Sequence, residues 1–152
     1  MPAPFPIEML AEIARHAGES RDRKSIQQCT LVSRAFRGVF EPWMYNTPAF
    51  GNAEPTAGSV ADPTWGDWNV ENTSHLLDTM SARPSLGCHT TAVVVGVAAS
   101  LDDEHLPKLL TLLPLVKFFT LFALGQNWSC LGTETQRAAI RMCQSSTLVI
   151  YS

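Results

Sequence analysis

The sequence predicts an α-helical segment followed by an α/β segment. Residues 1–47 carry apolar side chains at spacings of three and four, which is the period of an amphipathic helix. Residues 70–152 alternate β-branched apolar runs with helical runs, and strands that are separated by helices pair in parallel. Residues 51–69 hold three glycines and two prolines with few aliphatic side chains, so we interpret residues 48–69 as a loop or an insertion.

Composition and charge restrict the classes of protein that are possible. The chain has 152 residues, of which 45% are hydrophobic and 16% are charged, so it can bury a core but has room for only one ordinary domain or a small module with a second one. The net charge is −3, and no window gathers the basic residues into a stripe that could neutralise a run of phosphates. Nucleic acid is therefore not expected as a partner.

Cysteine usage and hydropathy bear on the compartment. The four cysteines are widely spaced and form no CxxC pair, and residues 1–4 have neither the basic start nor the apolar stretch of a secretory leader. We expect reduced thiols and a cytoplasmic or nuclear location. The most apolar stretch, Leu106 to Leu124, contains two lysines and two prolines, so we do not expect a membrane span or a membrane partner.

The first segment is expected to form three short helices. Pro6 suits a first helical position, and Gly18 is placed to end a helix over residues 6–17 in a left-handed cap. A second apolar series runs from Ile26 to Trp43 with a break near residues 30–34, and Pro42 is expected to end it.

The second segment is expected to alternate helices and strands. Its acidic residues 102–104 are interpreted as the first turn of a helix, where negative charge complements the free N–H groups. The expected helices are 71–83, 103–113 and 134–143, and the expected strands are 91–97, 116–124 and 148–151.

The expected strands share a pattern that recurs. Val93 and Phe119 are 26 residues apart, and Phe119 and Tyr151 are 32 apart. A strand-plus-helix unit of this length resembles a degenerate leucine-rich repeat, in which each unit buries its apolar face against the next. The last unit stops in the middle of the pattern, so we expect either a truncated repeat region or an end that something else covers.

Two sequence blocks in residues 5–45 carry a second resemblance. The first is Phe5-Pro6-x-Glu8-x-Leu10-x-x-Ile13, and the second is the run Cys-Thr-Leu-Val-Ser-Arg-Ala-Phe-Arg at residues 29–37. Together, in this order and followed by repeat-like units, they resemble an F-box or the F-box-like variant of fungi. The family pattern begins with Leu-Pro, where this chain has Phe5-Pro6, and its Trp or Phe position is taken here by Phe36.

The F-box resemblance implies a three-helix module that binds a Skp-type adaptor and, through it, a cullin in an SCF-type ubiquitin ligase. The C-terminal units would then hold a target protein for ubiquitin-dependent degradation. By the same resemblance, Leu10 and Val39 would lie inside the module and not contact the adaptor. The implied adaptor contacts are Phe5, Pro6, Ile13, Leu31, Val32, Ser33 and Phe36. The alternative is that these are ordinary core residues of a helical hairpin.

Candidate target contacts come from strand alternation and from two tryptophans. If Phe119 and Leu121 point inward, then Phe118, Thr120 and Phe122 lie on the other face of the sheet, unless the insertion or another segment covers that face. Trp65 and Trp68 either anchor the loop onto the fold or form a recognition hot spot.

Sequence motifs for catalysis are missing. Ser33 lacks the glycines of a nucleophile elbow, and there is no phosphate-binding GxxxxGK[ST] or GxGxxG loop. Cys88 and His89 are adjacent, which suits no metal-ligand spacing, so neither metal nor cofactor is expected. The alternative to the adaptor is a truncated or degenerate repeat protein that acts only as an interaction or structural module, and a small enzyme is a third possibility.

Overall fold

The chain forms two compact units, residues 1–46 and 47–152, in a computed structural model. The structure describes residues 6–20, 22–50, 72–96, 101, 103–122 and 128–151. The boundary between the units lies one residue before the boundary expected from the sequence. Phe5, Trp65 and Trp68 lie outside the described residues, and so does the side chain of Phe122.

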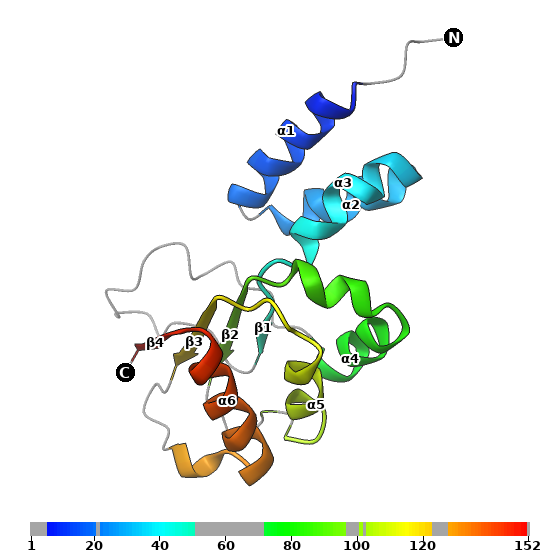
Figure 1. Ribbon diagram of the computed structural model, residues 1–152. Coiled ribbons are helices and arrows are strands. Elements are labelled where there is room, and N and C mark those ends of the chain that lie inside the picture. The colour runs from blue at the N-terminus through cyan, green and yellow to red at the C-terminus, as the bar shows by residue number, and fades with distance from the viewer. Residues whose placement is uncertain are drawn as a thin grey trace. The chain divides into compact units, whose positions relative to one another are not determined.

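The described part of the first unit consists of three helices (Figure 1). These are α1 (Ile7–Glu19), α2 (Arg23–Val32) and α3 (Arg34–Met44). The carboxylate of Asp22 caps α2 by accepting a hydrogen bond from the N–H of Ser25 at 3.1 Å. The side chain of Ser33 caps α3, because its extended backbone separates the two helices and its Oγ accepts from the N–H of Phe36 at 3.3 Å. The break expected near residues 30–34 is therefore present.

The helical unit has a small core cluster, beside which Gly18 and Trp43 approach each other closely. Ala14, Ile26 and Phe40 are its fully buried centre, with one residue from each helix. Gly18 was expected to end α1, but the helix continues to Glu19 and Gly18 lies against the indole of Trp43 instead. A Cβ at residue 18 would lie 2.0 Å from Cε3 of Trp43, so glycine is required here by space and not by a left-handed backbone.

The expectation that Pro42 ends the second apolar series was wrong. Helix α3 runs through Pro42 to Met44. A proline inside a helix removes the hydrogen bond to the carbonyl four residues earlier, which here belongs to Gly38. Gly38 is exposed, so water can satisfy its carbonyl group.

The second unit contains a four-stranded parallel sheet in its described residues, with the strand order β1-β2-β3-β4. The strands are β1 (Ala49–Phe50), β2 (Ala92–Gly96), β3 (Phe118–Phe122) and β4 (Thr147–Tyr151). The sequence did not predict β1, which has only two residues. Because the order in the sheet is the order in the chain, each strand pairs with the strand that precedes or follows it.

Strand register confirms one expected repeat spacing and corrects the other. Val93 pairs with Phe119, as the 26-residue spacing indicated. Phe119 pairs with Leu148, however, and Tyr151 pairs with Phe122. The expected equivalence of Phe119 and Tyr151 was therefore wrong by three residues, because an apolar run in a buried strand offers no alternation that fixes its register.

The helices of the second unit lie together on one side of the sheet (Figure 1). They are α4 (Thr73–Ala82), α5 (Leu106–Thr111) and α6 (Thr133–Ser145), with short 3-10 helices η2 (Pro84–His89) and η3 (Trp128–Cys130). Right-handed crossovers between neighbouring parallel strands place every helix on the same face. The apolar side chains of Val93, Val95 and Phe119 are almost fully buried.

Asp103 and Glu104 were expected to lie in the first turn of a helix, but the structure places them before one; Asp102 lies outside the described residues. Helix α5 begins later, at Leu106, and Asp103 lies in the preceding turn. Its Oδ2 accepts a hydrogen bond from the N–H of Gly132 at 2.9 Å, just before α6. Asp103 thus links the segments that precede two successive helices.

Within the described residues, no helix has both the length and the apolar character needed to cross a bilayer.

We predict opposite effects for two glycine substitutions in the helical unit. Gly18→Ala should lower the free energy of unfolding by about 1–3 kcal/mol, because the new methyl group would overlap the Trp43 ring. Gly38→Ala should raise it by about 0.5–1 kcal/mol, because no atom lies within 4 Å of a Cβ there and alanine favours the helix. Urea unfolding followed by circular dichroism measures both, and the same sign for both variants would contradict the contact between Gly18 and Trp43.

Candidate functional site

Several apolar side chains of the helical unit are exposed, on α1 and at the end of α2. Pro6 precedes α1, and Met9 and Ile13 follow at spacings of three and four residues, so these residues lie along one flank of the helix. The end of α2 contributes Leu31 and Val32, whose exposed fractions are 74% and 64%. Figure 1 shows the start of α1 and the turn between α2 and α3 toward the same end of this unit. We call these five residues the apolar end surface.

The local structure explains why Leu31 and Val32 face solvent. Helix α2 turns Ile26 and Thr30 inward, where both are buried, and the hydroxyl of Thr30 donates to the carbonyl of Gln27 at 2.7 Å. Leu31 and Val32 follow at the end of the helix, away from this inward side. The extended backbone of Ser33 then starts α3 in a new direction.

Two of the expected adaptor contacts have structural roles of their own. Ser33 is exposed and caps α3, so its hydroxyl already accepts a backbone hydrogen bond. Phe36 is half-buried, packs against the core and stacks on Phe40 with ring centroids 5.9 Å apart. Phe36 therefore stabilises the helical unit. It also follows Leu31 and Val32 closely in the sequence.

The burial of Leu10 agrees with the expected internal position, and Met9 is an exposed residue that was not expected. Leu10 is buried, as expected for an internal position, and Val39 is half-buried. Ile7 and Ile13 are about half exposed, and Ile13 is one of the adaptor contacts that the F-box resemblance implies. Met9 was not considered in the sequence, but its spacing of four from Ile13 was the signal that could have identified it.

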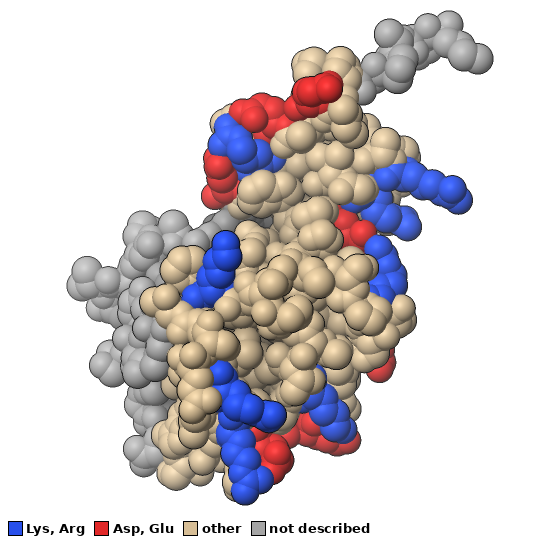
Figure 2. All heavy atoms as spheres, in the orientation of Figure 1, with Lys and Arg blue, Asp and Glu red and all other residues tan. Residues whose placement is uncertain are grey.

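The opposite flank of α1 is polar and internally paired. Arg15 binds Glu12 at 2.6 Å and Glu19 at 2.5 Å. The hydrogen bond from Arg15 lowers the pKa of Glu12, and its two carboxylate partners raise the pKa of Arg15. Figure 2 shows acidic and basic side chains gathered together over α1. This flank is therefore charged but locally compensated, whereas the apolar end surface carries no charged side chain.

In the second unit, two of the candidate target contacts differ in exposure. Phe118 is 51% exposed at the start of β3, between Ala92 and Thr147 on the neighbouring strands. Thr120 was expected to be exposed on the same face but is only 8% exposed, and its register partner Val94 is also buried. Both faces of a parallel sheet are usually covered, so Thr120 is not available to a target.

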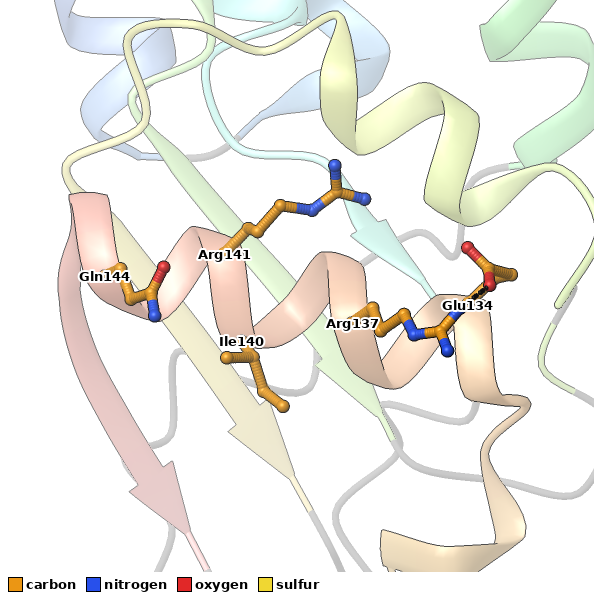
Figure 3. A pocket seen from close by; sticks show the side chains of 5 residues that line it. All are labelled: Glu134, Arg137, Ile140, Arg141 and Gln144. Carbon is orange, nitrogen blue, oxygen red and sulfur yellow. Dashed lines mark hydrogen bonds and ion pairs between the residues drawn. The ribbon is translucent and has the colours of Figure 1, made fainter.

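A shallow hollow lies along the exposed side of α6 (Figure 3). Its volume is about 410 Å³, and Arg137 forms an ion pair with Glu134 at its edge. All five lining residues belong to one helix, so the hollow is open to solvent and offers no enclosed site for a small molecule. The lining residues are Glu134, Arg137, Ile140, Arg141 and Gln144.

The described side chains do not gather into a recognisable catalytic or metal centre. Among residues that the structure describes, no group of three or more His, Cys, Asp and Glu side chains could hold a metal ion. All four cysteines are free, with Cys88 and Cys130 exposed. Cys143 is half-buried, and this burial raises the pKa of its thiol, which makes it a weaker nucleophile at neutral pH.

Comparison with known proteins gives no relative: no protein-family model, no curated protein and no solved structure matches this chain.

We predict that the expected adaptor contacts differ in their effects on stability. Phe36→Ala should lower the free energy of unfolding by about 1–3 kcal/mol, because a half-buried ring that stacks on Phe40 is lost. Leu31→Ala should change it by less than about 0.5 kcal/mol, because that side chain is 74% exposed. Thermal or urea unfolding distinguishes the two, and a large loss for Leu31→Ala would mean that Leu31 belongs to the core.

Proposed function

We propose that this chain is a substrate-recruiting adaptor of an SCF-type cullin ubiquitin ligase. In this proposal the helical unit is an F-box-like module that binds a Skp-type adaptor, and the second unit holds the target protein. The chain itself performs no chemistry. It raises the effective concentration of the target near the ubiquitin-transfer machinery, so both units must be occupied at the same time.

The exposure of Leu31 and Val32 is the observation that carries the proposal. These residues lie in the second block of the F-box resemblance, and the resemblance implies that they bind the adaptor. In a unit with so small a core, two adjacent aliphatic side chains at the surface are a cost unless a partner covers them. Pro6, Met9 and Ile13 are further exposed apolar residues at and along α1, which suits a partner that offers a hydrophobic groove.

The strand order supports a leucine-rich-repeat-like character for the second unit. Each strand pairs with its neighbour in sequence, and one helix follows each of β2 and β3 before the next strand. This is the arrangement in which repeats stack one on another. Phe118 is the described residue that we propose as a target contact, because its ring is exposed between two small neighbouring side chains.

The apolar end surface makes the adaptor proposal testable by co-purification. The double variant Leu31→Ala, Val32→Ala should lose at least about 30-fold in affinity for a Skp-type adaptor, which corresponds to removing central anchors worth about 2 kcal/mol. The measurement is capture of the purified chain by the immobilised adaptor, with affinity from titration calorimetry. Both substitutions are at exposed positions, so the variant should remain folded by circular dichroism.

A matched control is available in the second unit. Leu115 and Ile140 are exposed to 53% and 50%, and their double alanine variant removes similar apolar area without touching the helical unit. It should bind the adaptor as tightly as the unaltered chain. The proposal fails if the folded chain captures no Skp-type adaptor, or if the Leu31, Val32 variant binds as well as the control.

A further inference from the structure

The two edges of the parallel sheet differ in how they are protected. Strand β1 has two residues and follows Pro48, and short strands and prolines are common means of blocking an edge. Strand β4 is five residues long, and within the described residues no strand pairs with its outer side. From residue 142 to residue 152 the sequence has no charged residue and no proline.

The hydrogen bonds of β4 identify the backbone groups that point away from β3. The N–H of Thr147 donates to the carbonyl of Lys117 at 2.7 Å, so residue 147 directs its backbone toward β3. Alternate residues of a parallel strand point their backbone groups to opposite sides. In the observed register, Leu148 and Ile150 therefore direct their N–H and C=O groups away from β3.

We propose that the outer edge of β4 pairs with β4 of a second copy of this chain. A two-fold axis perpendicular to the strands makes such a pair antiparallel, because it brings the same strand of both copies together in opposite directions. With the axis at Val149, residue 148 of one copy faces residue 150 of the other, so each outward N–H meets an outward carbonyl. The result is one continuous sheet across both copies.

The uncharged sequence favours a second copy as the occupant. An identical strand brings no charge to the edge, whereas like charges facing each other across a two-fold axis would oppose self-pairing. The run Thr-Leu-Val-Ile-Tyr at residues 147–151 consists of residues with high strand propensity. Edge strands of this composition that lack a protecting charge or proline readily pair with identical strands of other copies.

Sedimentation velocity over roughly a hundredfold range of protein concentration tests the proposal. We expect a shift from the monomer mass of 16.7 kDa to twice that value as the concentration rises. Ile150→Pro should remain monomeric, because it removes an outward N–H and places a ring at the edge without removing a bond to β3. The matched control Ile150→Thr keeps the N–H and the β-branched shape, so it should still form the dimer.

Amide hydrogen exchange on the unaltered chain gives a second measurement, which does not depend on whether a substituted chain folds. The N–H groups of Leu148 and Ile150 should exchange at least tenfold more slowly at high than at low concentration, and the N–H of Thr147 should not change because it is already bonded. A chain that stays monomeric at every concentration overturns the proposal. Equal dimerisation of Ile150→Pro, or no concentration dependence at Leu148 and Ile150, also overturns it.

Discussion

The division of 152 residues between two separate cores is the constraint from which the other features of this protein follow. Small units bury a small fraction of their surface, so some apolar side chains must remain outside. In the helical unit Ala14, Ile26 and Phe40 form one buried cluster, and Leu31 and Val32 stay exposed. In the second unit many apolar residues are buried, and within the described residues the outer edge of β4 pairs with no strand.

The sequence predicted those elements in which local pattern and packing agree. The helix from Pro6, the break before α3 and the three longer strands are all present because periodicity, caps and burial favour the same structure. The errors occur where a tertiary contact decides. Gly18 lies inside a helix and leaves space for Trp43, and Pro42 lies inside a helix four residues after the exposed Gly38. Neither fact is visible in a single helical segment.

The candidate site was predictable in part, for similar reasons. The F-box resemblance named residues by position, and the structure adds which of them are exposed: Leu31 and Val32 strongly, and Phe36 only in part. Alternation alone assigned Phe118 and Thr120 to one face, but it contains no information about what covers that face. Met9 was not predicted, although it is exposed and lies four residues before Ile13.

The neighbour-to-neighbour order of the strands has a consequence for how the chain folds during synthesis. Each strand joins the one made just before it, so no strand has to be inserted between two that have already paired. The search for each partner spans one crossover, and the sheet can grow from one side as the chain lengthens. The order of synthesis is therefore also an order in which the described elements can assemble. The helical unit is synthesised completely before the first long strand, β2.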